Sequence, residues 1–376
     1  MSRLRMGRFA AAAVRLTLRF FYLLLILCCA APFCSAQSAG ELIYSVGATS
    51  FPSAHASTVV ELRDGTVMSA WFGGTAEGKP DVAIWSARRD GKGWSAPVEM
   101  VRESGTPCFN PVLFHAADGK LWMYYKFGPT AATWSAGRIS STDEGTTWSK
   151  PEHMPAGLLG PIRAKPLVLK DGTIVSGSSF ESYREWAVWI ERSTDNGATW
   201  AKIGPIVPPV DLDQHGLGDG KPMPPDPGGS MDSKFTQGII QPSVVQMSGS
   251  HLRLYARPTL KTARVVVADS MDNGKTWTQG RPIDVPNPNS GIDALALPDG
   301  RIVLIYNNTV TGRTPLNLAV STDGEHFHMF KTLEDAPGEY SYPALVQAAN
   351  GDLLMTYTWN RKTIKYVRLP VANVPR

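Results

Sequence analysis

Apolar residues along this chain come in pairs of short runs that are separated by a tight turn. In the first pair, the runs 58–62 and 66–71 flank Asp64-Gly65. Asp-Gly or Asn-Gly between alternating apolar runs is the strongest short-range signal for a β-hairpin. Similar turns follow at Asp118-Gly119, Asp171-Gly172, Ser248-Gly249, Asp299-Gly300 and Asn350-Gly351. The pattern therefore predicts six hairpins, and no helical stripe longer than a turn or two accompanies them.

A second pattern, Ser-x-Asp-x-Gly-x-Thr-Trp, follows three of these hairpins. It occurs at residues 141–148, 193–200 and 270–277, with weaker copies at 86–94 and 321–327. Most copies are about fifty residues apart, a spacing that is typical of an array of equal structural units. Ser and Asp side chains bind nearby backbone N–H groups, and Gly adopts positive φ, so these residues are expected to build turns. The Asp-x-Asp-x-Asp spacing of a calcium loop is absent.

Each predicted unit contains a hairpin, a third strand and an Asp-containing turn. Four-stranded units repeated radially make a β-propeller. The sequence therefore predicts an all-β fold, a six-bladed β-propeller of four-stranded antiparallel blades. The last unit lacks a turn of this kind, so residues 41–46 are expected to supply its outer strand and close the ring, which leaves no free edge.

The first 36 residues have the composition of a secretory signal peptide. A basic segment precedes the apolar residues 20–31, and Cys34-Ser35-Ala36 is a plausible cleavage site. An uncleaved N-terminal anchor is the alternative interpretation. Cleavage would leave one propeller domain, residues 37–376, in a secreted or periplasmic protein without stable membrane association. A monomer is the expectation.

Removal of this leader changes the charge and the cysteine content of the chain. Five of the 37 basic residues lie in the leader, which contains no acidic residue, so the mature chain has 32 basic and 33 acidic residues. The basic balance of the whole chain is therefore no argument for nucleic acid binding. Only Cys108 remains, so no intrachain disulfide is possible. A chain of this length can instead bury a large core.

One long segment interrupts the repeat. Residues 205–234 are rich in Pro, Gly and Asp and show no periodicity. Long loops of this kind are often functional, and a disordered surface excursion is the alternative.

Ligands of propellers bind where the innermost strands meet the central axis, so polar residues near the start of each hairpin are candidates. These are His55, Asn110, Lys165, Gln241, Asp293 and Tyr340. Loops that leave the second strands add Glu77, Asp81, Lys126, Glu181, Arg257 and Arg313. Buried charges are costly unless they are paired, so this cluster indicates either a site or an ion-paired plug, for example Lys165 with Glu181. His55 could be a structural histidine, Asp293 could cap a turn, and one of Tyr340 and Tyr342 is expected in the core.

These motifs resemble those of the sialidases, six-bladed propellers with Asp-box repeats, over nearly the whole mature chain. The resemblance implies an arginine triad that holds a substrate carboxylate, and Arg257 and Arg313 match its second and third members. It implies Tyr340 as the nucleophile and Asp81 as the acid/base. It also implies a terminal acidic sugar as substrate, such as sialic acid, and hydrolysis without a cofactor or metal.

Three positions depart from the pattern of that family. His55 stands where the first triad arginine would be, and Gln241 stands where a glutamate would activate the tyrosine. The acid expected near Trp359 to support the first arginine is absent. These linked changes indicate adaptation to another substrate more than random decay.

The departures leave the chemistry open. A tyrosine with a pKa of about 10 is a poor nucleophile unless a base takes its proton, and neutral Gln241 cannot do so. His55 could, with Asp81 or Glu77 as the acid. The same groups would also fit a lyase or hydrolase for a uronate- or rhamnose-containing glycan. A non-catalytic glycan-binding propeller is the third possibility.

Overall fold

The computed structural model describes residues 40–181, 185–209 and 237–376. The expected leader and most of the segment 205–234 lie outside the described residues. Residues 40–376 form one compact unit. Among the described residues, no helix is long and apolar enough to cross a membrane.

The described residues form an all-β fold in which antiparallel strands are grouped in sequence order. The first sheet contains β2 (Ser53–Glu61), β3 (Val67–Gly74), β4 (Ala83–Asp90), β5 (Gly93–Trp94) and β6 (Val98–Val101). The second contains β7 (Cys108–His115), β8 (Leu121–Phe127), β9 (Ser135–Ser141) and β10 (Glu152–His153). A third runs through β11 (Leu167–Val168), β12 (Ile174–Glu181), β13 (Glu185–Ser193), β14 (Ala201–Ile206), β15 (Gln237–Ser248), β16 (His251–Pro258), β17 (Arg264–Ser270) and β18 (Arg281–Pro286).

Two further four-stranded sheets complete the fold. One contains β19 (Asp293–Ala296), β20 (Ile302–Tyr306), β21 (Leu316–Ser321) and β22 (His328–Glu334). The other contains β23 (Tyr340–Gln347), β24 (Leu353–Trp359), β25 (Thr363–Leu369) and β1 (Glu41–Leu42). Short 3-10 helices lie at η1 (Ala131–Thr133) and η3 (Val371–Asn373).

All six predicted hairpins are confirmed, because each pair of strands that flanks a predicted turn is antiparallel. The turn glycines have positive φ, as at Gly65 (81°) and Gly351 (90°), a conformation that favours glycine. β1 pairs with β25 as expected, but this strand covers only Glu41–Leu42 of the segment 41–46.

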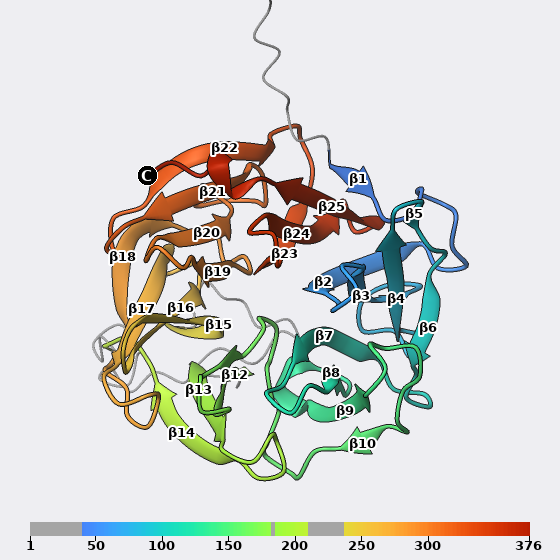
Figure 1. The fold of residues 1–376 in the computed structure, drawn as a ribbon, viewed down its shortest axis with the longest axis horizontal. Helices are drawn as coiled ribbons and strands as arrows, with labels where there is room; N and C mark the ends of the chain where they lie inside the picture. Colours follow the sequence, from blue (N-terminus) through green and yellow to red (C-terminus); the bar gives the residue numbers. More distant parts are fainter. Residues whose placement is uncertain (1–39, 182–184, 210–236) are drawn as a thin grey trace, which may run out of the picture. The chain divides into compact units, whose positions relative to one another are not determined.

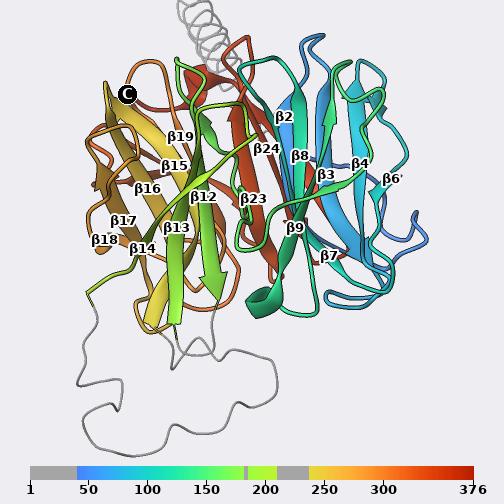
Figure 2. The ribbon, with the colours of Figure 1, turned by 90° about the horizontal axis from the view of Figure 1, so that it is seen from below.

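The strand groups lie around a central opening in a propeller-like arrangement (Figure 1). β2, β7, β15, β19 and β23 lie nearest the centre. The view from the side shows strands of neighbouring groups standing next to one another (Figure 2). Apolar side chains fill the space between neighbouring groups: Val60, Met68 and Phe72 pack with Leu113 and Met123 of the next sheet. The core thus holds the groups together, and Cys108 is a free, buried thiol within it.

Four inner strands share an irregularity near their first residues. The pairing of β2, β7, β15 and β23 with the following strand shifts register, and one residue of each irregularity has positive φ. These residues are Ala56 (54°), Asn110 (39°), Gln241 (53°) and Tyr342 (51°). A β-bulge of this kind re-aims side chains and is common beside active sites. The same end of each inner strand is therefore specialised.

The Ser-x-Asp-x-Gly-x-Thr-Trp segments are structural turns, as expected. In the second copy, Ser193 accepts a hydrogen bond from the Gly197 N–H (2.8 Å) and donates to Asp195 Oδ1 (2.7 Å). Asp195 also accepts bonds from the backbone and hydroxyl of Thr199. The hydroxyl bond is the largest cause that lowers the pKa of Asp195 to about 2. The other two full copies, at 141–148 and 270–277, repeat these contacts.

An arginine from each preceding group binds each of these turns. Arg138 Nη1 donates to the Gly197 carbonyl (2.6 Å), Arg192 to Asn273 (3.2 Å) and Arg253 to Gly324 (3.1 Å). Arg88 makes the equivalent bond to the carbonyl of Glu144. The turns thus link neighbouring strand groups, which explains why the motif repeats.

Candidate functional site

Tyr342 is the centre of a buried polar cluster at the bulged ends of the inner strands. Its hydroxyl accepts hydrogen bonds from Arg257 Nη1 (2.7 Å) and Gln241 Nε2 (3.3 Å). Arg257 also donates to Gln241 Oε1 (3.1 Å), and its Nε donates to Asn289 (2.7 Å). Two side-chain donors from different strands thus converge on one phenol oxygen.

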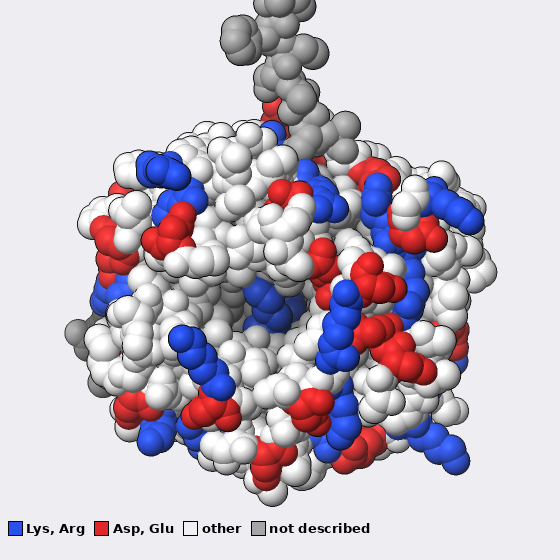
Figure 3. All heavy atoms as spheres, in the orientation of Figure 1, with Lys and Arg blue, Asp and Glu red and all other residues white. Residues whose placement is uncertain are grey.

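Three guanidinium groups surround the ring of Tyr342. Those of Arg163, Arg257 and Arg313 lie 5.4, 5.6 and 5.5 Å from the ring centroid, within the range of cation–π contacts. Lys or Arg side chains also lie deep in the central hollow as it is seen from the opposite face, which carries the hairpin turns (Figure 3). The arrangement suits an anionic ligand, because charge-assisted bonds to guanidinium groups are strong.

Glu339 partly offsets this positive charge. Its carboxylate accepts bonds from Arg313 Nη1 (2.9 Å) and Arg361 Nε (2.9 Å), and Arg361 also pairs with Glu77. Burial alone would raise the pKa of Glu339, but the charge of Arg313 and the bond from Arg361 outweigh burial and lower it. Glu339 is therefore a carboxylate near neutral pH, and Arg361 has two carboxylate partners.

His55 lies against Tyr342, with 4.3 Å between the ring centroids. Only 1% of His55 is exposed, and neither ring nitrogen has a hydrogen-bond partner among the described residues. Burial is the largest cause that lowers its pKa well below the usual 6.5, and the charges of Arg361, Arg313, Arg257 and Arg163 lower it further. The imidazole is therefore neutral at pH 7.

The two carboxyl groups predicted near the entrance differ in environment. Asp81 is exposed, and its carboxylate accepts bonds from the backbone (2.7 Å) and hydroxyl (2.6 Å) of Thr75. The hydroxyl bond is the largest cause that lowers the pKa of Asp81. A lowered pKa favours the carboxylate form of Asp81 at neutral pH, and the acid/base role that the resemblance implies for Asp81 stays a prediction.

Glu181, at the end of β12, is only partly exposed and pairs across the strand with Trp186. Arg257 lies over the Trp186 ring at 5.8 Å, which brings Glu181 near the cluster. Burial raises the pKa of Glu181 to about 7; Arg257 acts to lower it and Glu77 to raise it further. Glu181 can therefore both donate and accept a proton near neutral pH.

Tyr340, which the resemblance implies as the nucleophile, does not lie in this cluster. It pairs with Trp359 across β23 and β24, and its ring lies 6.5 Å from the Trp359 ring. The bulge places Tyr342 in the cluster instead. A signal for this difference is present in the sequence: Tyr342-Pro343 corresponds to Gln241-Pro242 and Asn110-Pro111 at the bulges of the other inner strands.

Lys165 and Asp293 form a structural contact rather than part of the cluster. Lys165 Nζ lies 3.1 Å from both carboxylate oxygens of Asp293, which also accepts bonds from Ser243 Oγ (2.6 Å) and the Leu345 N–H (2.8 Å). Asp293 therefore connects three inner strand groups. The expected pair of Lys165 with Glu181 is not found, because Lys165 binds Asp293.

Neither Arg163 nor Arg361 was among the residues predicted from the sequence. Arg361 lies between β24 and β25, and Arg163 lies in the irregular segment before β11. Arg361 stands two residues after Trp359, where the resemblance implies an acid, so the charge at this place is reversed. Asn110 lies at its bulge, and its Nδ2 has no partner among the described residues.

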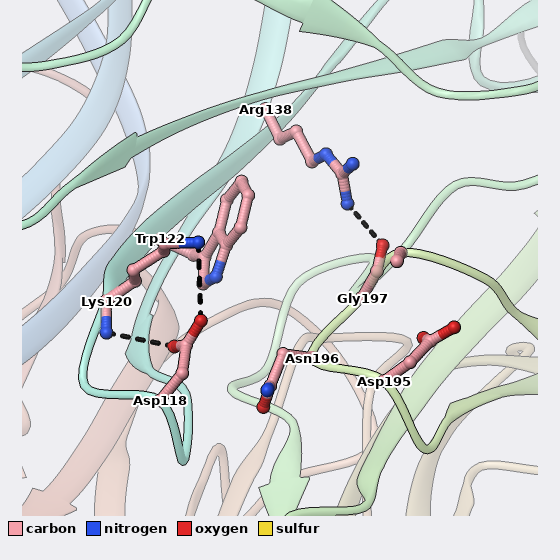
Figure 4. Close-up of a pocket in the computed structure, with 8 residues that line it drawn as sticks. Asp118, Lys120, Trp122, Arg138, Asp195, Asn196 and Gly197 are labelled. Atoms are coloured by element: carbon pink, nitrogen blue, oxygen red, sulfur yellow. Dashed lines mark hydrogen bonds and ion pairs between the residues drawn. The ribbon is translucent and has the colours of Figure 1, made fainter.

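A separate pocket lies where the β7–β8 turn meets the turn after β13 (Figure 4). It has a volume of about 380 Å³ and is lined by Asp118, Lys120, Trp122, Arg138 and residues 195–198. Figure 4 shows the bond from Arg138 to Gly197 across it. The β7–β8 turn lies at the opposite end of these strands from the bulge at Asn110, so this pocket is distant from Tyr342. In the described ranges, no three His, Cys, Asp or Glu residues are arranged to hold a metal ion.

Comparisons with known proteins agree with this architecture. A family model described as a BNR repeat-like domain matches residues 65–355. The structure is similar to that of the Hadza microbial sialidase Hz136, with a TM-score of 0.70, 16% identity, and coverage of 89% of this chain and 69% of that one. No curated protein sequence matches.

Two other solved structures are similar over most of both chains. One is a protein of unknown function from Dyadobacter fermentans, with a TM-score of 0.68, 19% identity, and coverage of 88% of this chain and 97% of that one. The other is the intramolecular trans-sialidase from Ruminococcus gnavus, with a TM-score of 0.65, 13% identity, and coverage of 89% and 98%. At these identities the structural similarity shows the fold alone.

Proposed function

The chain belongs to the BNR-repeat family of the sialidase superfamily, and from this premise we propose that it hydrolyses a terminal acidic sugar from a glycan. The observation that carries the proposal is the Tyr342 hydroxyl, which accepts a bond from Arg257 while three guanidinium groups surround its ring. A nucleophile beside cationic groups suits a substrate that carries a carboxylate next to its reacting carbon.

The proposed fold is a six-bladed propeller. The antiparallel pairings divide β2–β25 into six groups of strands, because only a short parallel contact joins β13 to β15. β1 would close the ring through its pairing with β25. Closure of the ring would place the first residues of all six inner strands around one central opening, which we call the mouth.

In the proposed reaction, Arg257 and Arg313 hold the sugar carboxylate. The oxygen of Tyr342 attacks the anomeric carbon and gives its proton to a water molecule, because burial and the nearby arginines disfavour a cationic His55. The bond to the leaving oxygen breaks as that oxygen takes a proton from Glu181. A second water molecule then attacks the glycosyl-enzyme while Glu181 accepts its proton, and the released Tyr342 oxygen takes a proton from water.

The experiment that tests this function is turnover of a fluorogenic α-sialoside by residues 37–376. Tyr342→Phe is expected to lower kcat/KM by about 10³-fold or more, because it removes the nucleophilic oxygen. Tyr340→Phe is the matched control and is expected to stay close to wild type. Equal loss in both variants, with both folded, would contradict the assignment of Tyr342.

A second candidate function is glycan binding without turnover. Gln241 favours it, because the amide donates to the Tyr342 hydroxyl and cannot accept its proton. Wild-type protein that binds sialosides but turns over none would support this function. Gln241→Glu together with His55→Arg would then be expected to introduce activity.

A lyase acting on a uronate- or rhamnose-containing glycan is a further alternative. It would give an unsaturated product that absorbs in the ultraviolet, which hydrolysis does not. An absorbing product from acidic plant or bacterial glycans would replace the hydrolase proposal.

The cellular location also belongs to the proposal. Residues 1–36 are proposed to direct export and to be removed, which would leave a secreted or periplasmic monomer that meets its glycan outside the cytoplasm. N-terminal sequencing of the exported protein tests this expectation, and retention of residue 1 would contradict it.

A further inference from the structure

The base of the mouth contains a cationic group that the proposed reaction does not use. Only 3% of Arg163 is exposed. Its Nη2 donates to the Pro343 carbonyl, while Nε and Nη1 have no partner among the described residues. Guanidinium groups keep their charge in proteins, and a buried donor without a hydrogen-bond partner destabilises the fold. The open donors of Arg163 therefore need a ligand.

No described carboxylate neutralises Arg163. Asp293 is near enough for its charge to raise the pKa of Arg163, although burial outweighs this effect and lowers it. However, the oxygens of Asp293 already bind Lys165, Ser243 and Leu345. Glu339 binds Arg313 and Arg361 instead. The missing counter-charge must come from outside the described chain.

A second open polar group lies beside the same tyrosine ring. Both ring nitrogens of His55 have no partner in the described ranges, and its ring lies 4.3 Å from that of Tyr342. Arg163 offers two open N–H groups and a neutral imidazole offers one donor and one acceptor, so open donors outnumber open acceptors here. Such a surplus favours an anion over water alone.

The loop that presents Arg163 is held from two sides by buried charges. Lys126 Nζ donates to the Pro161 carbonyl, and Glu191 accepts bonds from the N–H groups of Leu159 (3.0 Å) and Gly160 (2.6 Å). Gly291 leaves space on the other side, since a Cβ there would lie 2.9 Å from Arg163 Nε. These contacts hold the Arg163 side chain in a position where no described carboxylate binds its guanidinium group. Such a preorganised, unpaired cation is expected of an anion-binding site.

We propose that Arg163 and His55, which both lie against the Tyr342 ring, form a buried anion site that binds one monovalent anion. The ligand chemistry is a small anion that accepts several N–H bonds: either the carboxylate group of a substrate or a free halide. The proposal of an anion site depends only on the N–H donors that have no partner, and it does not depend on whether the chain is a hydrolase. Only the assignment of the anion to a substrate carboxylate rests on the proposed function.

Thermal unfolding of residues 37–376 tests the site. Sodium bromide or sodium acetate replaces increasing amounts of the sodium salt of a bulky sulfonate, so that the ionic strength stays constant. For wild type, Tm is expected to rise by about 2 °C for each tenfold increase in anion above Kd. Arg163→Met is expected to lose this saturable rise. Arg264→Met, which removes an exposed arginine, is the matched control and is expected to keep it.

A second measurement remains decisive if Arg163→Met does not fold. Anomalous diffraction from wild-type crystals soaked in bromide is expected to place an ion within hydrogen-bond distance of Arg163 Nε or Nη1. No saturable effect of either anion on wild type would overturn the proposal. The same effect in folded Arg163→Met, or bromide located only elsewhere, would also overturn it.

Inhibition kinetics distinguish the two sources of the anion, provided that wild type turns over a sialoside. Bromide that raises KM without changing kcat would assign the site to the substrate carboxylate. Bromide that stabilises the protein without affecting KM would assign it to a free anion. Absence of turnover, with bromide still bound at Arg163, would reject the hydrolase and leave the anion site intact.

Discussion

The repeated turns at the rim and the polar cluster around Tyr342 are built in opposite ways. At the rim, the same side chains make the same bonds in the three full copies of the turn, and each of their Asp carboxylates accepts several local hydrogen bonds. In the cluster, no contact repeats, several buried donors are open, and two residues with positive φ, Gln241 and Tyr342, touch each other. Repetition in this chain indicates fold, and its loss indicates function.

The largest difference between the two regions is expected in turnover. Glu181→Gln should lower kcat by about 10²–10³-fold for substrates with alkyl leaving groups, because the departing oxygen then needs a proton. The loss should be much smaller for an aryl leaving group, which leaves without protonation. Asp81→Asn, which removes the other predicted carboxylate, should lower kcat equally for alkyl and aryl leaving groups. Steady-state kinetics with both types of substrate measures this difference.

A leaving-group dependence that appears in Asp81→Asn and not in Glu181→Gln would reverse the assignment. It would return the acid role to the residue that the resemblance to the family implies.

A rim variant is expected to change stability alone. Ser193→Ala removes the hydroxyl that binds Gly197 and Asp195, so it leaves a buried N–H without a partner. The free energy of unfolding should fall by about 1–3 kcal/mol, measured by chemical denaturation, with kcat/KM unchanged. A large change in kcat/KM without loss of stability would contradict the assignment of a purely structural role to the rim turns.

The smallest expected effect is the response of the rim to acid. Local hydrogen bonds lower the pKa of Asp143, Asp195 and Asp272 to about 2 in the folded chain. A lowered folded-state pKa contributes stability that is complete above the unfolded value of about 3.9 and is lost as pH falls through 2. Tm measured from pH 5 to pH 2 should therefore fall over this window, and less steeply in Asp195→Asn.

The sequence predicted the repeated parts of the fold best. Hairpins and turns depend on local residue patterns, so Asp-Gly pairs and the Ser-x-Asp segments located them correctly. The pair of Lys165 with Asp293 was missed, because it joins residues far apart in the chain whose side chains only the tertiary structure brings together.

The site was predicted in part. Arg257, Arg313, Gln241 and His55 do lie around one tyrosine. The resemblance implied Tyr340 at this place, whereas Tyr342 lies in the cluster, because a bulge shifts which side chains of β23 face it, and strand alternation alone cannot reveal the bulge. Arg163 and Arg361 lie outside the regular strands, where no periodic pattern marks a residue as inward-facing.

The pairing of β1 with β25 has a consequence for the time at which the chain can finish folding. Residues 41–42 find their partners only at residues 365–366, almost at the other end of the chain. At a synthesis rate of about 5–20 residues per second, roughly 15–65 s pass between the synthesis of this first strand and that of its partner. Until then its backbone groups stay available to any other strand, so a newly made chain is most exposed to aggregation or to a chaperone at its beginning.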